Sequence, residues 1–185
     1  FNHCGASAFL SSVFDAEILI HKSAINSLSG GDHFSTWASR FNSDMPHTSA
    51  IAISDEQKFN VGKIILEAIH LPGHSIDSMG YYVESHELLI AGSTIPGEKR
   101  VSRWDLPTGC LPDLADSLEL LIDLDLEILI TGFGEQINGK KVIKNALELQ
   151  RDFLDTCIDL ESSEYSKLFS KPAQTVTYLT PNDWN

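Results

Sequence analysis

Apolar residues recur at helical spacing in two long segments of the chain. Leu114, Leu118 and Leu121 lie three or four residues apart, which predicts an amphipathic helix over residues 112–124. The same pattern predicts a longer amphipathic helix over residues 140–160. Two shorter segments are also expected to be helical: residues 6–13 and 22–28.

Short apolar runs between these segments predict strands. The run at residues 17–20 is too short for a helix and is typical of a buried strand in α/β proteins. Four later runs are expected to form an antiparallel meander, with Glu84-Ser85-His86 as a tight connection between its last two strands. These are residues 51–53, 63–70, 80–83 and 87–91. Further strands are expected at residues 127–131 and, as an edge strand, at residues 175–179.

An aromatic stripe follows Gly30-Gly31. Phe34, Trp37, Ala38 and Phe41 recur every three or four residues and predict one apolar helix face. Such a face usually packs against the rest of the domain, but it could instead line a pocket. The pocket candidates are Phe34, Trp37, Phe41 and Trp104.

The length and composition of the chain favour one globular domain. It has 185 residues, of which 42% are hydrophobic, enough to bury a core. No linker rich in Gly, Pro and Ser divides it, so residues 1–160 are expected to form the domain and residues 161–185 an extension or edge strand. No apolar run is long enough to span a bilayer.

Charge and cysteine usage limit the partners and the compartment. Thirteen basic against 26 acidic residues give a net charge of −13, which repels nucleic acid and anionic membrane surfaces. The three cysteines are odd in number and widely spaced, which favours a reducing cytoplasm. A small-molecule ligand fits this composition better than a polyanion.

Four short motifs occur along the chain in a fixed order: Asn2-His3-Cys4-Gly5, Leu71-Pro72-Gly73-His74-Ser75, Gly92-Ser93-Thr94 and the segment 130–135 with the sequence Ile-Thr-Gly-Phe-Gly-Glu. Together they resemble the motifs of the metallo-β-lactamase superfamily, in particular those of its glyoxalase II and lactonase-like branch. The match covers about residues 1–150. The resemblance implies an αββα sandwich with its site at the strand ends, of which this chain supplies the later portion.

The resemblance also implies a degenerate dinuclear metal centre. The first metal motif of the family reads His-x-His-x-Asp-His, and the chain begins at its fourth position, so a His-x-His pair would lie upstream of Phe1. Asn2 and Ser93 stand where the family has aspartates, and Phe133 stands where it has a histidine. His74 and His3 remain as weak metal candidates, and the resemblance implies either no metal or one zinc or iron ion.

Each histidine also has an ordinary structural interpretation. His74 could simply shape its turn by bonding to nearby backbone, and His3 could be a packing residue. The other histidines lack paired ligand spacing and are expected at the surface or in packing: His21, His33, His47, His70 and His86. Ser75 and Asp77 lie beside His74 but not in a strand-turn-helix elbow, so a serine hydrolase is not predicted.

Three hypotheses of function follow. The leading one is a catalytically impaired, hydrolase-like protein that binds a ligand or partner. The second is a mononuclear hydrolase of an ester, thioester or lactone, completed by ligands upstream of Phe1. The third is a structural half that pairs with an upstream fragment or with a second copy, because an incomplete sandwich exposes strand edges and apolar surface.

Overall fold

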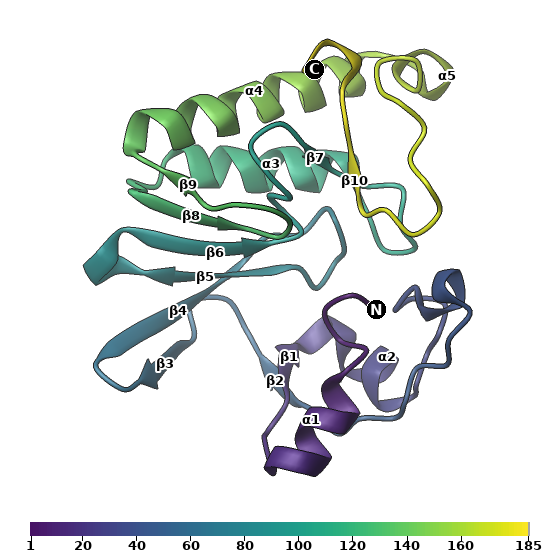
Figure 1. Ribbon diagram of the computed structural model, residues 1–185, viewed down its shortest axis with the longest axis vertical. Coiled ribbons are helices and arrows are strands. Elements are labelled where there is room, and N and C mark those ends of the chain that lie inside the picture. The colour runs from purple at the N-terminus through teal and green to yellow at the C-terminus, as the bar shows by residue number, and fades with distance from the viewer. Residues whose placement is uncertain (185) are drawn as a thin grey trace.

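Six strands form the central sheet of the computed structural model, which describes residues 1–184. Their spatial order is β3-β4-β5-β6-β8-β9 (Figure 1). Strands β3 to β6 are antiparallel neighbours, β8 runs parallel to β6, and β9 is antiparallel to β8. Their bounds are β3 Lys58–Val61, β4 Ile64–His70, β5 Met79–Val83, β6 Leu88–Gly92, β8 Ile128–Thr131 and β9 Ile137–Asn138.

Helices α3 (Leu111–Ile122) and α4 (Lys140–Asp159) cover one face of this sheet (Figure 1). Parallel strands need a crossover connection, and α3 lies in the one between β6 and β8. Leu89 and Leu129 are register partners on these strands, and both are fully buried against the helices. Burying such a side chain stabilises the fold by roughly 1.5–3 kcal/mol. The helical members of the core are Leu114, Leu118, Leu121, Ile143, Leu147 and Leu154.

Residues 1–53 form a smaller unit on the opposite side of the sheet (Figure 1). Two of its strands, β1 and β2, pair in parallel as a separate sheet. A small core of Leu28, Ala38 and Met45 holds this unit together. Its elements are α1 Ser7–Phe14, β1 Leu19–His21, the 3-10 helix η1 Lys22–Ala24, α2 Ile25–Ser29, the 3-10 helix η2 Ala38–Phe41 and β2 Ile51–Ile53.

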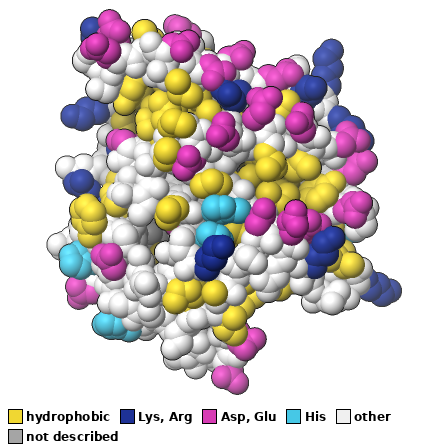
Figure 2. All heavy atoms as spheres, turned by 180° about the vertical axis from the view of Figure 1, so that it is seen from behind, with side chains coloured by type: hydrophobic (Ala, Val, Ile, Leu, Met, Phe, Trp, Pro, Cys, Tyr) yellow, Lys and Arg dark blue, Asp and Glu magenta, His cyan; other side chains and the backbone are white. Residues whose placement is uncertain are grey.

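The layers are therefore helices, a six-stranded sheet, a two-stranded sheet and outer helices. This is the mixed α/β class and the later portion of an αββα sandwich, as the sequence predicts. Within residues 1–184, no helix combines the length and the apolar character needed to cross a membrane. Acidic side chains, magenta in Figure 2, are spread over the rear face between hydrophobic patches, in keeping with the net charge of −13.

Residues 161–184 pack against the main core through Tyr165, Leu168 and Phe169. This segment contains α5 (Ser162–Tyr165), β10 (Tyr178–Leu179) and the 3-10 helix η4 (Asn182–Trp184). Strand β10 pairs antiparallel with β7 (Val101–Ser102), so the expected edge strand is shorter than residues 175–179. Residue 185, the last of the predicted extension, lies outside the described residues.

The helices expected at residues 112–124 and 140–160 are confirmed to within two residues, but the expected aromatic helix is wrong. Residues 33–36 form turns, Trp37 has a left-handed φ of 64°, and only Ala38–Phe41 is a 3-10 helix. Asp32 accepts the N–H groups of Phe34 and Ser35, as a helix N-cap residue does, and its carbonyl accepts the Thr36 N–H over 3.2 Å. The left-handed backbone at Trp37 then ends this turn before a regular helix forms.

The composition of the expected meander also needs correction. Residues 51–53 do form a strand, but it pairs with β1 in the smaller sheet. Its place in the meander is taken by β3, which the sequence did not predict because Lys58 and Asn60 make the segment half polar. The turn to β4 uses Gly62, whose φ is 64°. Strands at residues 63–70, 80–83, 87–91 and 127–131 are confirmed.

The loop after β4 is held directly on the first turn of α3. Gly73 has a φ of 125°, and a Cβ atom placed on it would lie 2.2 Å from the backbone nitrogen of Leu114. The Cys110 N–H donates to the Gly73 carbonyl over 2.9 Å, and Ser117 Oγ donates to the Pro72 carbonyl over 2.7 Å. The absence of a side chain at residue 73 therefore lets this loop reach the helix.

We expect Gly73→Ala to lower the free energy of unfolding by about 3 kcal/mol or more, because the new methyl group meets backbone that cannot move away cheaply. Gly62→Ala is the matched control. Gly62 has a φ of 64° with nothing within 4 Å of an added Cβ, so only the left-handed strain of about 1 kcal/mol applies. Chemical denaturation measures both, and equal losses would contradict the packing argument.

Candidate functional site

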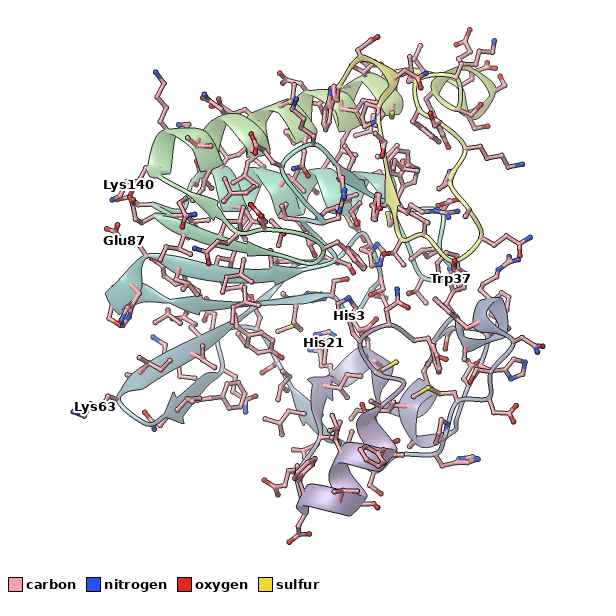
Figure 3. All side chains as sticks on the ribbon, viewed as in Figure 1. His3, His21, Trp37, Lys63, Glu87 and Lys140 are labelled. Atoms are coloured by element: carbon pink, nitrogen blue, oxygen red, sulfur yellow. The ribbon has the colours of Figure 1, made fainter. Side chains whose placement is uncertain are left out.

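A cavity of about 500 Å³ lies between the N-terminal unit and strands β5 and β6 of the central sheet. Its walls come from residues 1–7, from β1 to α2, from the loop after β4 and from the segment after β6. Figure 3 shows His3 and His21 between the N-terminal unit and the sheet. Much of the lining is apolar, including Ile18, Ile20, Trp37, Phe41, Ile76, Met79, Tyr81 and Ile90.

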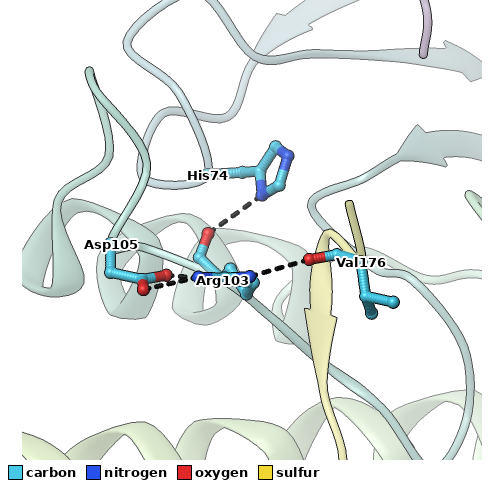
Figure 4. Close-up of polar contacts among 4 residues, drawn as sticks. All are labelled: His74, Arg103, Asp105 and Val176. Atoms are coloured by element: carbon cyan, nitrogen blue, oxygen red, sulfur yellow. Dashed lines mark hydrogen bonds and ion pairs between the residues drawn. The ribbon is translucent and has the colours of Figure 1, made fainter. Parts of the chain in front are cut away.

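His74 forms a buried part of the cavity wall. Its Nδ1 lies 2.9 Å from the Arg103 carbonyl oxygen (Figure 4). The same nitrogen lies 2.9 Å from Ser102 Oγ. A carbonyl can only accept, so Nδ1 carries the proton and Nε2 keeps a lone pair. Burial lowers the pKa of His74 to about 4, so the ring is neutral near pH 7.

Ser102 connects His74 to the segment after β6. Its hydroxyl donates to the Ser93 carbonyl oxygen over 2.7 Å, and Ser102 is 1% exposed. Because that O–H is committed to the carbonyl, the Ser102 oxygen can only accept from His74. One chain of hydrogen bonds therefore fixes His74, Ser102 and the backbone of Ser93.

Arg103 lies behind the cavity wall and contacts residues on two sides of it. Its guanidinium makes two 2.7 Å bonds to the carboxylate of Asp105 and donates to the Val176 carbonyl over 2.9 Å (Figure 4). The hydrogen bonds from Arg103 lower the pKa of Asp105, which stays ionised. The guanidinium also lies 5.3 Å from the ring centre of Trp37, a cation–π contact that fixes this aromatic side chain at the cavity.

His3 contacts Ser93 on the opposite wall. Its Nε2 lies 2.7 Å from Ser93 Oγ, although the two residues are 90 positions apart in the chain. The ring of His3 meets Phe133 edge to face, with centroids 6.4 Å apart. Burial lowers the pKa of His3, so this imidazole too is favoured in its neutral form.

The structure brings four of the predicted metal-site positions to one cavity: Asn2, His3, His74 and Ser93 all line it. Phe133 does not line it but contacts His3 from behind. The aromatic candidates divide. Trp37 and Phe41 line the cavity, whereas Phe34 is 64% exposed and Trp104 packs in the main core against Tyr165 and Phe169.

Sequence reasoning missed a stacked pair of histidines beside the cavity. The rings of His21 and His70 lie 4.1 Å apart, nearly parallel at 14°, and His21 lines the cavity. The sequence places both at the surface or in packing, because their spacing in the chain matches no ligand motif. No local signal pairs a residue of β1 with one of β4.

The residues present do not complete a metal site. Catalytic zinc needs three protein ligands and a water, and structural zinc needs four. Within residues 1–184, no group of three or more His, Cys, Asp or Glu side chains could hold a metal ion. The Nε2 of His3 is already engaged by Ser93 Oγ, which removes its readiest donor atom.

Comparison with known proteins identifies the fold family. A family model described as the metallo-beta-lactamase superfamily matches residues 1–132. The chain belongs to this superfamily. A protein of Methanocaldococcus jannaschii, named as a probable metallo-hydrolase, is 30% identical over 139 residues, which cover 73% of this chain and 66% of that protein. The metallo-hydrolase YqgX of Bacillus subtilis, also named as probable, is 26% identical over 138 residues, or 74% of this chain and 65% of that one.

Solved structures show the same fold. A crystal structure of a protein in a di-iron-bound form superposes with a TM-score of 0.63 at 22% identity, covering 78% of this chain and 69% of that one. A metallo-beta-lactamase family protein from Thermus thermophilus gives a TM-score of 0.64 at 20% identity, covering 81% and 56%. The chain thus covers between 56% and 69% of the length of these superfamily relatives.

We expect the free energy of unfolding to fall as pH drops from 6.5 towards 4. In this window the unfolded chain protonates His74, whereas the folded chain keeps it neutral, so acid favours unfolding. The loss attributable to His74 is up to about 3 kcal/mol. Denaturation at several pH values measures it.

His74→Asn is the control for this pH dependence. It keeps an N–H donor for the Arg103 carbonyl but has no titrating ring. The variant should lose less stability than the natural chain over the same pH window, whatever its stability at pH 7. Parallel pH profiles for the two proteins would contradict the assignment.

Proposed function

We propose that this chain is a hydrolase-like member of its superfamily that binds a small ligand in the cavity and does not hold two metal ions. One observation carries the proposal: His3 Nε2 bonds to Ser93 Oγ over 2.7 Å. These two side chains stand at positions where the family resemblance implies metal ligands, and here they form a hydrogen bond with each other instead. A second metal would need an anionic oxygen or a ring nitrogen, which none of Asn2, Ser93 and Phe133 supplies.

The size and lining of the cavity support a small organic ligand. About 500 Å³ falls within the usual range of small-molecule sites, which are mostly apolar with a few polar groups. Here the polar groups include His74, Ser93 and Thr177, whose buried hydroxyl has no hydrogen-bond partner among the described residues. The net charge of −13 makes a nucleic acid an unfavourable partner.

The mononuclear hydrolase is the alternative, and the orientation of His74 favours it. An imidazole that donates Nδ1–H to a carbonyl and keeps the Nε2 lone pair is arranged as metal-binding histidines usually are. The other ligands would then have to come from residues upstream of Phe1. That enzyme would cleave an ester, thioester or lactone.

Zinc titration of the metal-free chain separates these proposals. We expect calorimetry to show no site tighter than about 1 µM, because a complete zinc site releases roughly 10–16 kcal/mol and two uncoupled imidazoles cannot. His74→Ala should leave this weak binding unchanged.

One tightly bound zinc or iron ion per chain, lost in His74→Ala, would favour the mononuclear hydrolase. Two tightly bound metal ions per chain would contradict both proposals. The same titration of a chain extended upstream of Phe1 tests for missing ligands.

A second candidate function is pairing with another chain. Helix α1 leaves Phe9 at 63%, Val13 at 54% and Phe14 at 68% exposure, a cluster of large apolar side chains on one short helix. Apolar surface of this kind marks interaction sites. We therefore propose that α1 contributes to an interface with a second copy or with an upstream fragment.

Light scattering after size exclusion tests the pairing. We expect a mass above the 20.4 kDa of one chain at high protein concentration, falling towards that value for Phe14→Glu because a charge cannot be buried there cheaply. Leu149→Glu, at a 44% exposed position on α4, is the control and should change nothing. A natural chain that stays monomeric at every concentration would refute pairing between copies.

A further inference from the structure

Ser93 occupies a sharply defined position at the end of a strand. The register of β6 against β8 shifts between Ile90 and Gly92, and Gly92 has a φ of 55°, so the chain turns as it leaves the sheet. Ser93 follows at once, lines the cavity and is 8% exposed. The bond from Ser102 Oγ to the Ser93 carbonyl fixes its backbone.

His3 stands within hydrogen-bond reach of this hydroxyl. The 2.7 Å from Nε2 to Ser93 Oγ is the separation at which an imidazole can take the proton of a serine nucleophile. The edge-to-face contact with Phe133 supports the ring from behind. A nucleophile, a base and a cavity large enough for a substrate therefore meet at one place.

We propose that Ser93 is a nucleophile and His3 its general base, for acyl or phosphonyl transfer from ester-like substrates without a metal ion. Ser93 donates its O–H to Nε2, and His3 carries its ring proton on Nδ1. This inference goes beyond the proposed ligand binding and uses a chemistry that needs none of the missing metal ligands.

The reaction balances with water as the second reactant. Ser93 Oγ forms a bond to the carbonyl carbon as its proton passes to His3. The ester C–O bond then breaks, and the leaving alkoxide takes that proton and departs as an alcohol. Water, deprotonated by His3, attacks the acyl-serine, releases a carboxylic acid and restores Ser93. With a fluorophosphonate, Ser93 displaces fluoride and the phosphonylated serine remains.

Other serine–histidine contacts among the described residues lack this setting. Ser102 Oγ lies 2.9 Å from His74 Nδ1, but that nitrogen carries the ring proton and cannot take one from a serine. Ser85 Oγ lies 2.9 Å from His86 Nδ1, but both residues are exposed neighbours away from the cavity. Ser23 contacts His21 at the cavity edge, where the same Nδ1 also accepts the Ser23 backbone N–H as a helix cap. Among these four serines, Ser93 alone combines a buried position, a turn after a strand and a histidine base from a distant segment.

The test is labelling of the chain with a rhodamine fluorophosphonate, with the modified residue mapped by peptide mass spectrometry. We expect one adduct on Ser93, unchanged by a metal chelator, and none in Ser93→Ala. His3→Gln should slow labelling by about 100-fold, the usual contribution of a general base. Ser85→Ala should label at the natural rate. Thermal melts check that each variant is folded.

Three outcomes would overturn the proposal. The first is a natural chain that stays unlabelled at Ser93 under excess probe, a result that does not depend on any variant folding. The second is a folded His3→Gln variant that labels at the natural rate, which would leave His3 as a packing residue. The third is labelling that a chelator abolishes. Failure here would leave intact the proposal that the chain does not hold two metal ions, because zinc titration tests that proposal separately.

Discussion

The Nδ1–H of His74 is donated to the Arg103 carbonyl and to Ser102 Oγ, and Ser102 donates in turn to the carbonyl of Ser93. This chain of hydrogen bonds joins the loop after β4, the segment after β6 and strand β7. Both hydrogen-bonding side chains, His74 and Ser102, are buried, and an unpaired polar group that is withdrawn from water is costly. The cavity wall therefore keeps one geometry, and the positions of His74 and Ser93 depend on each other.

That network is anchored to the main core through Gly73. The loop that carries His74 lies against the first turn of α3, closer than any side chain at residue 73 would allow. Helix α3 is in turn fixed by its leucines, which are buried between α4 and the sheet. Packing of apolar residues far from the cavity thus determines where a polar ring lies inside it.

Two histidines of the cavity favour their neutral forms. Burial lowers the pKa of both His3 and His74, so neither brings positive charge to the site. In a metal centre the cation supplies the local charge and activates water. The contact of His3 with Ser93 is the place in the described cavity where we propose that side chains supply such reactivity.

More of the fold than of the site could be predicted from the sequence. Periodicity alone placed α3, α4 and four of the central strands to within about two residues, because each buries one face and repeats at the spacing of its own geometry. The helix predicted for the aromatic segment after Gly31 is wrong, because the left-handed backbone of Trp37 ends the turn that Asp32 caps. Strand β3 was missed because an edge strand needs little apolar content.

For the site, the sequence by itself determined which residues were candidates and which ligand types had been replaced. Only the tertiary structure decided which of them meet. His3 reaches Ser93 across 90 residues, and His21 stacks on His70 between two different sheets. Local sequence patterns carry no record of such pairs. They form because the packing of the N-terminal unit against the open side of the sheet brings distant segments together, and that packing depends on the whole chain.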